Sequence, residues 1–416
     1  MNVRFGLSTI LCLACLTGCP NTEGDKPAPD KAAQTETPAP PSPPEVKPDD
    51  PQVVAALEKL GAQLTKNDAG NVTAVSLESL EYTTDDLAAL SGLPSLVDLD
   101  LAKTEPGDEG LAKVAELEQL KILRLRRCGM SDAGLQHLAV LENLEQLHLL
   151  YNSSNITDAG MEPIGKLSNL QLLDLRGCTL IGDAGLEHLK SLKNLKNLKI
   201  RSFGVYDAGV EHLQGMTKLK ALALEDTKLS DAGMKYLKDL TNVVDLNLFR
   251  TQVSDEGLQY LSGMKNLKNL KLRDTSVEGP GLEHLQDATG LTILDLSETI
   301  VGDDGLQYLA PFTNLEDLNL WYDDVSDEGL VHLMPLTKLK KLNLEKTMVS
   351  DIGAEQLAKF TNLESLNMRE TKLTDTGLEK LQGLTQLTAL DVGGTEVTDE
   401  GVEKLQAALP NCQVKR

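Results

Sequence analysis

The chain has 416 residues, of which 3% are aromatic, and a formal net charge of −23 at pH 7. This excess of negative charge argues against nucleic acid as the main partner, because phosphate binding requires a cationic surface. It favours solubility and cationic partners instead.

Residues 1–18 have the pattern of a secretory signal peptide. An apolar run from Phe5 to Leu16 is too short to span a bilayer as a permanent helix. The run ends in Leu16-Thr17-Gly18-Cys19, which resembles the lipobox of bacterial lipoproteins. That resemblance implies that Cys19 is acylated and anchors the mature chain to a bacterial membrane, with the rest of the chain outside the cytoplasm. The alternative is an ordinary secretory signal in which Cys19 is incidental.

Residues 19–51 follow as a tether. They contain ten prolines, from Pro20 to Pro51, separated mainly by Ala, Thr, Glu, Lys and Asp. Such a segment has too little apolar surface to fold, so we expect an extended spacer. Residues 52–71 come next, with apolar side chains at helical spacing from Val53 to Leu64. We expect them to form a helix that caps the open end of the domain that follows.

Residues 72–411 repeat a unit of 24 residues that reads L-x-x-L-x-L-x-x-T-x-V-x-D-x-G-L-x-x-L-x-x-L-x-N. Thirteen clear units begin at Leu96, and a degenerate unit precedes them. This period is the signature of a leucine-rich-repeat solenoid. Positions 1, 4 and 6 alternate with polar residues as in a half-buried strand, and positions 16, 19 and 22 have helical spacing.

The fold prediction is therefore an α/β class solenoid, curved, with about 14 repeats. A parallel β-sheet is expected on the concave face and helices on the convex face. Residues 412–416 are predicted to form a C-terminal cap, in which Cys412 and Val414 belong to one last strand.

Each unit enters its helix through Ser/Thr/Gly-Asp-x-Gly-Leu, as in residues 131–135. We expect the hydroxyl and carboxylate to cap the helix that they precede. A side chain in place of the glycine is expected to collide with the adjacent turn. The recurring aspartates could also be interpreted as a row of cation sites. Capping is the better interpretation, because one carboxylate per unit supplies too few oxygens for calcium.

Position 9 is mostly threonine, but it is cysteine at Cys128 and Cys178. These units resemble the cysteine-containing subclass of leucine-rich repeats, best known from F-box substrate receptors. The resemblance implies the fold and binding through the inner surface. An F-box-like substrate-receptor role is disfavoured, because the signal sequence directs export and no F-box segment is visible.

No motif for catalysis is apparent. The chain has no Gly-rich phosphate loop and no nucleophile motif. Five of the six histidines recur at one position of the outer helices, where side chains diverge instead of converging on a metal. We therefore expect no enzyme activity, no cofactor and no metal site.

Function is expected on the concave face, at repeat positions 3, 5, 7 and 8. Two groups of residues stand out there. One group, the basic patch, consists of Arg124, Arg126, Arg127, His148, Tyr151, Arg176, Lys199 and Arg201. The other consists of Phe249, Arg250, Trp321 and Tyr322, in which strand spacing places Phe249 about 14 Å from Trp321. Exposed Trp, Tyr and Arg dominate interface energies.

Nearby acidic side chains offer an alternative for the basic patch. Asp98, Asp100 and Asp174 could neutralise its arginines, in which case the patch is structural.

The predicted function is that of a membrane-anchored, monomeric protein that binds a macromolecular partner, preferably a protein, through its concave surface at the cell envelope. Two alternatives stay open. One is a glycan- or cell-wall-binding module, in which Trp321 and Tyr322 stack on sugar rings. The other is an architectural envelope protein without a defined ligand.

Overall fold

The computed structural model describes residues 47–152 and 155–416. The predicted signal peptide, Cys19 and most of the predicted tether lie outside the described residues. The described residues belong to one compact unit.

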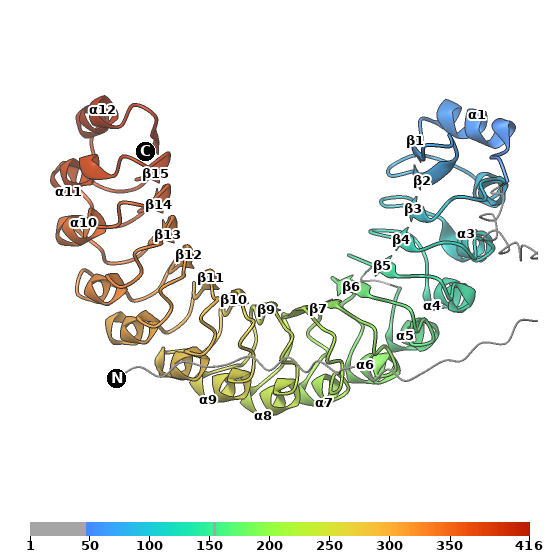
Figure 1. Cartoon of the computed structure of the whole chain (residues 1–416), viewed down its shortest axis with the longest axis horizontal. Coiled ribbons are helices and arrows are strands. Elements are labelled where there is room, and N and C mark those ends of the chain that lie inside the picture. The colour runs from blue at the N-terminus through green and yellow to red at the C-terminus, as the bar shows by residue number, and fades with distance from the viewer. Residues whose placement is uncertain (1–46, 153–154) are drawn as a thin grey trace, which may run out of the picture. The chain divides into compact units, whose positions relative to one another are not determined.

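Sixteen strands of the described residues form a single sheet in which each strand pairs with the next along the chain. From β2 onward the pairing is parallel, and equivalent positions of neighbouring repeats lie side by side, as Leu246, Leu270 and Leu294 do. The strands line the concave side of this unit and the helices its convex side (Figure 1). The predicted leucine-rich-repeat solenoid is confirmed.

The strands are short, which leaves most of each repeat to the turns and the return segment. Their bounds are β1 (Gln63–Lys66), β2 (Val72–Ser76), β3 (Asp98–Asp100), β4 (Ile122–Arg124), β5 (Gln146–His148), β6 (Leu172–Arg176), β7 (Asn197–Arg201), β8 (Ala221–Glu225), β9 (Asp245–Asn247), β10 (Asn269–Lys271), β11 (Ile293–Asp295), β12 (Asp317–Asn319), β13 (Lys341–Asn343), β14 (Ser365–Asn367), β15 (Ala389–Asp391) and β16 (Gln413–Lys415).

The return segments are α-helical in most repeats and 3₁₀-helical in others. The α-helices are α1 (Pro51–Leu60), α2 (Thr84–Ala89), α3 (Gly107–Val114), α4 (Asp132–His137), α5 (Met161–Ile164), α6 (Asp183–Leu189), α7 (Asp207–Glu211), α8 (Asp231–Met234), α9 (Asp255–Leu258), α10 (Asp351–Leu357), α11 (Asp375–Lys380) and α12 (Asp399–Ala408). The 3₁₀-helices are η1 (Leu90–Gly92), η2 (Leu138–Val140), η3 (Asp158–Gly160), η4 (Lys235–Leu237), η5 (Gln259–Leu261), η6 (Pro280–Leu285), η7 (Asp303–Leu309), η8 (Gly329–Leu333) and η9 (Leu381–Gly383).

The recurring leucines form one continuous core. In a typical repeat the strand leucines Leu123 and Leu125 and the helix leucines Leu135 and Leu138 are all fully buried. Each such side chain contributes roughly 1.5–3 kcal/mol when it leaves water. Because every repeat supplies the same leucines, the core extends along the whole sheet and holds the concave side chains in register.

The aspartate that recurs at the start of each return helix, such as Asp132, joins neighbouring repeats. The Ser131 hydroxyl accepts a hydrogen bond from Ala133 and so caps its own helix. The Asp132 carboxylate instead accepts hydrogen bonds from the backbone N–H and the hydroxyl of Thr157, at 2.9 and 2.5 Å, in the next repeat. The carboxylate does lie in the first turn of its own helix, at the positive end of the helix dipole as predicted, but the hydrogen bonds that it accepts come from the next repeat. The hydroxyl before it already serves that helix, which leaves the carboxylate to join neighbouring repeats.

The same carboxylates explain the glycine column. A Cβ atom on Gly160 would lie 2.4 Å from Oδ1 of Asp132, well inside contact distance. The predicted collision with the adjacent turn is thus confirmed.

The N-terminal cap is shorter than the helix predicted over residues 52–71. Helix α1 ends at Leu60 because Gly61 adopts a left-handed conformation, with φ at 86°. The chain then returns as β1, which includes Leu64 and pairs antiparallel with β2. At the other end β16 pairs with β15; it contains Val414 as predicted, but it begins one residue after Cys412.

Candidate concave binding surface

The turn after each strand places side chains on the rim of the concave face. Four predicted site residues, Arg127, Tyr151, Arg250 and Tyr322, have φ angles of 54°, 59°, 54° and 62°. This left-handed conformation destabilises a residue other than glycine by roughly 1–2 kcal/mol. Sequence analysis missed this feature, because glycine, the usual signal for it, is rare at this position.

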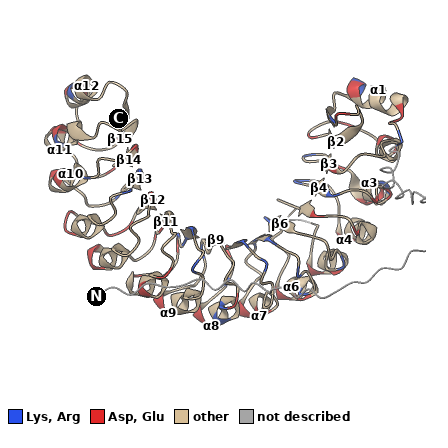
Figure 2. Cartoon of the chain, viewed as in Figure 1, with Lys and Arg blue, Asp and Glu red and all other residues tan. Residues whose placement is uncertain are grey.

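The basic patch is largely neutralised by carboxylates. Ion pairs join Arg124 to Asp98, Arg126 to Glu78 at 2.9 Å, Arg176 to Asp174 at 2.8 Å and Arg201 to Asp226 at 2.5 Å. Asp174 and Asp226 are each only 3% exposed. Figure 2 marks the positions of basic (blue) and acidic (red) residues on the ribbon, and both kinds occur along the concave side. Sequence reasoning had singled out Asp98 and Asp174 as possible partners, but not Glu78 or Asp226.

The other members of the patch are less constrained by charge. The Arg127 guanidinium lies 5.3 Å from the centre of the Tyr151 ring, and that ring is 47% exposed. Burial, followed by the nearby Arg124, lowers the pKa of His148, so its imidazole is neutral at pH 7. Among the described residues, no carboxylate forms an ion pair with Lys199, unlike its neighbours Arg176 and Arg201.

The second predicted group is held together by a residue that sequence analysis missed. The Arg273 guanidinium lies 5.2 Å from the Phe249 ring centre and 4.7 Å from the Trp321 ring centre. Because one guanidinium contacts both rings, the ring centres of Phe249 and Trp321 are closer to each other than the separation of about 14 Å that strand spacing predicted. Arg250 stacks on Phe249 at 4.9 Å, and Lys346 lies within 5.8 Å of Trp321.

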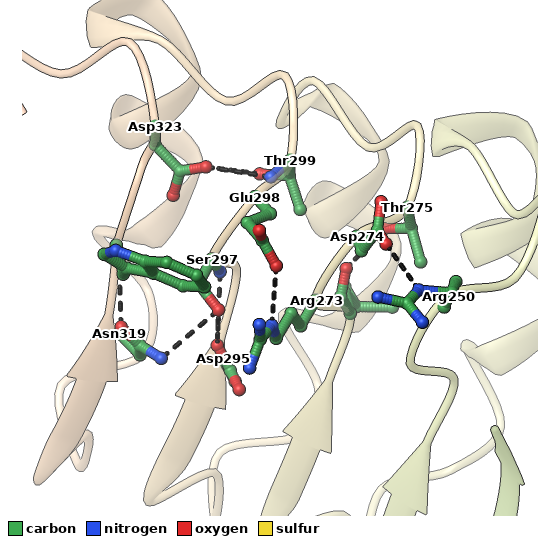
Figure 3. A network of polar contacts seen from close by, with 12 residues as sticks. Arg250, Arg273, Asp274, Thr275, Asp295, Ser297, Glu298, Thr299, Asn319 and Asp323 are labelled. Atoms are coloured by element: carbon green, nitrogen blue, oxygen red, sulfur yellow. Dashed lines mark hydrogen bonds and ion pairs between the residues drawn. The ribbon is translucent and has the colours of Figure 1, made fainter. Parts of the chain in front are cut away.

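We refer to Phe249, Arg250, Arg273, Trp321, Tyr322 and Lys346 as the aromatic–cation row. Carboxylates orient its arginines from the side: Asp274 accepts from Arg250 and Glu298 from Arg273, both at 2.8 Å (Figure 3). The indole Nε1 of Trp321 is buried and has no hydrogen-bond partner among the described residues. Such a donor costs about 1–3 kcal/mol until an acceptor reaches it.

A buried carboxyl group, that of Asp323, lies next to Tyr322 in the chain, and the sequence analysis did not identify it. Asp323 occupies the position that is threonine in neighbouring repeats, and it is 4% exposed. Its Oδ1 accepts from the backbone N–H of Thr299 at 2.9 Å (Figure 3). Burial raises the pKa of Asp323 to about 8, because no cation compensates the charge.

Within residues 47–152 and 155–416, no three His, Cys, Asp or Glu side chains are grouped so that they could hold a metal ion. Burial raises the pKa of the Cys128 and Cys178 thiols to about 11 and 12, which makes them poor nucleophiles. Their Sγ atoms donate instead to the carbonyls of Leu101 and Leu149 in the preceding repeats. In the described part of the chain, no helix combines the length and apolarity needed to cross a membrane.

These features define a repeat scaffold with a long, open concave sheet. The chain matches the family model of a leucine-rich repeat region over residues 93–286 and 162–413. It therefore belongs to the leucine-rich-repeat family, whose curved solenoids commonly serve as binding surfaces for proteins.

Many solved structures are similar to it, and two of them illustrate the likeness. One is an internalin from Listeria monocytogenes, with a TM-score of 0.59 and 22% identity, covering 87% of this chain and 92% of the internalin. The other is a leucine-rich-repeat protein from Leptospira interrogans, with a TM-score of 0.54 and 19% identity, covering 79% and 92%. At these identities the likeness shows the fold alone. A search of the curated proteins finds no match.

Proposed function

We propose that this chain is a lipid-anchored protein of a bacterial cell envelope whose concave sheet binds another protein. The observation that carries the proposal is the aromatic–cation row, in which Arg273 lies between Phe249 and Trp321. Tryptophan, tyrosine and arginine are the residues that contribute most to protein interfaces. Here they gather on the open face of a scaffold whose other faces repeat with little variation.

The row is a better candidate for the main contact than the basic patch. The arginines of the patch already have carboxylate partners, and so do Arg250 and Arg273 in the row, so free charge does not distinguish the two regions. The row differs from the patch in its cluster of aromatic side chains, of which Tyr322 is 61% exposed.

A protein suits the row better than a glycan does. Sugar rings bind by stacking on open aromatic faces, but Arg273 and Lys346 already lie over the Trp321 ring. A glycan would have to displace these cations without replacing their charge interactions. A protein can bring carboxylates and carbonyl groups that complement them.

The test is photocrosslinking in intact cells from a photoreactive residue at Tyr322. The control carries the same residue at Ile352, which is 67% exposed on helix α10 of the convex side. We expect a discrete protein adduct from position 322 only. Adducts of equal yield from both positions, or adducts to polysaccharide only, would contradict the proposal.

The affinity of the protein identified in this way should depend on Trp321. We expect Trp321→Ala to weaken its binding by about 30-fold, as for a central interface residue worth about 2 kcal/mol. Ile352→Ala serves as the matched control and should leave the affinity unchanged. A similar loss from both variants would point to a folding defect instead.

The lipid anchor is a separate part of the proposal. Its support is the Leu16-Thr17-Gly18-Cys19 sequence and the proline-rich segment that follows it. We expect the chain to fractionate with membranes and Cys19→Ser to move it to the soluble fraction. A wild-type chain that is already soluble would disprove the anchor without affecting the binding surface.

A further inference from the structure

A hollow lies in the concave sheet over strands β7 to β10. Its volume is about 270 Å³. The hollow exists because β8 carries Ala221 and Ala223 where the flanking strands carry longer side chains, such as Lys199 on β7 and Asn247 on β9. Two methyl groups therefore form the floor, and polar side chains form the walls.

Two lysines flank the hollow from opposite sides. In the strand register Lys199 is next to Ala223, Ala223 next to Asn247, and Asn247 next to Lys271. The lysines are thus three strands apart, or about 14 Å at their Cα atoms, and their long side chains can converge over the floor. Among the described residues, neither lysine takes part in an ion pair, although Arg176 at the same hollow is held by Asp174.

Two asparagines add further donors. The side-chain oxygens of Asn197 and Asn269 are buried and have no partner among the described residues. Both residues line the hollow, and their amide nitrogens are the groups that can donate to an anion there. The carboxylate of Glu225, also in the wall, already accepts a hydrogen bond from Asn247 at 3.0 Å. Asp245 is exposed at the rim, so it faces water as well as the hollow.

Some of the residues at the hollow also depart from a structural rule of the repeats. In eight repeats, including that of Asn247 at the hollow, the equivalent strand position holds Asp or Asn, whose side chain accepts the backbone N–H two residues later. Lys199, Ala223 and Lys271 occupy that position without being able to make this bond. Arg124 and His148 occupy the same position away from the hollow, so the departure is shared by other concave residues, but among the residues that the structure describes only those at the hollow bring two lysines to the sides of a small residue.

We propose that this hollow binds the carboxylate of an aspartate or glutamate side chain that projects from the protein partner. Lys199 and Lys271 supply charge, and Asn197 and Asn269 supply neutral donors to its two oxygens. The volume fits one side chain, whereas an extended glycan or a helix is too large for it. This inference rests on the proposed function, since it names a contact of the same concave face.

The test is a titration of the full chain, labelled with ¹³C in its alanine methyl groups, by N-acetyl-glutamate α-amide. Ala221 and Ala223 form the floor, so their methyl resonances report directly on the hollow. We expect a saturable shift of both resonances with this probe and none with N-acetyl-glutamine α-amide, which has the same size without the charge. Equal shifts with both probes, or no shift with either, would overturn the assignment.

Two variants test the two parts of the site. Lys199→Gln combined with Lys271→Gln should weaken binding of the glutamate probe at least about tenfold, because two charge-assisted hydrogen bonds are lost. Ala223→Leu should weaken it by filling the hollow while both lysines remain. Lys238→Gln, an exposed residue next to η4 on the convex side, is the matched control and should bind as the wild type does.

The source of the anion and the independence of the site need two more measurements. Inorganic phosphate that shifts the same resonances more strongly than the glutamate probe would overturn the assignment to a carboxylate. Trp321→Ala should leave the titration unchanged, because Trp321 does not line the hollow. A failed titration beside an intact crosslink at Tyr322 would therefore refute this subsite and not the proposed function.

Discussion

Buried carboxylates occur in both parts of the concave face, but only one part compensates them with cations. On the side of β6 to β8, Asp174 and Asp226 are 3% exposed and are paired with arginines. At β12, Asp323 is 4% exposed and has only the N–H and hydroxyl of Thr299. The arginines of the first part are thus used to neutralise the fold's own charges. In the second part, Arg250 and Arg273 also pair with carboxylates, but their guanidinium groups stack on aromatic rings as well.

The largest effect is expected from Asp323→Thr, which restores the residue of the neighbouring repeats. Because the pKa of Asp323 is raised to about 8 in the fold, the folded state holds a proton that the unfolded state releases near pH 4. Folded wild-type protein should therefore lose stability as the pH rises from 4 to 8. At about 1.4 kcal/mol for each pKa unit, the loss is roughly 3–5 kcal/mol, and it should vanish in the variant.

Urea unfolding followed by tryptophan fluorescence measures this loss at the right place, since Trp321 is the only tryptophan in the chain. The quantity to compare is the difference in unfolding free energy between variant and wild type at pH 4.5 and pH 8.5. A difference that does not grow with pH would show that Asp323 is compensated after all, and the contrast between the two parts of the surface would disappear.

A smaller effect is expected from Asp226→Asn in the part that is rich in arginine. Asp226 accepts from both Arg201 and Arg250 and sits at a φ of 52°, which asparagine tolerates, so the substitution removes charge without straining the backbone. Hydrogen bonds to charged groups contribute about 1.5–3 kcal/mol, and we expect a loss of about 2 kcal/mol in chemical denaturation.

Asp274→Asn is the matched control for that substitution. Asp274 also pairs with Arg250, but its side chain is 44% exposed, so the expected loss is below about 0.5 kcal/mol. Similar losses from the two variants would mean that burial of the carboxylate does not decide the strength of these pairs.

The sequence predicts the fold, but it does not predict which buried carboxylates are paired with arginine and which are not. The 24-residue period determines the sheet, the core leucines and the glycine column, because each depends only on contacts between identical positions of adjacent repeats. Which carboxylate an arginine reaches is a different matter. Arg126 pairs with Glu78 across two repeats, whereas Arg176 pairs with Asp174 on its own strand. That choice depends on side-chain conformation, which the period does not encode.

Arg273 shows the same limit for the candidate site. Its position on the concave face follows from the repeat, but its contact with both Phe249 and Trp321 depends on how three side chains lean along the sheet. The two alanines of the hollow were equally visible in the sequence. They became informative only when the structure placed unpaired lysines on both sides of them.

The smallest effect concerns Tyr322, which has a φ of 62° at the rim of the aromatic–cation row. Glycine adopts this conformation without strain, so Tyr322→Gly should change thermal stability by less than about 0.5 kcal/mol, the relief of strain offsetting the added freedom of the unfolded chain. Tyr322→Val should cost up to about 1 kcal/mol, because a β-branched residue fits this region more poorly than tyrosine does. Thermal unfolding followed by circular dichroism distinguishes the two. If glycine were as destabilising as valine, the tyrosine ring would be part of the fold, and its 61% exposure would no longer support a role in binding.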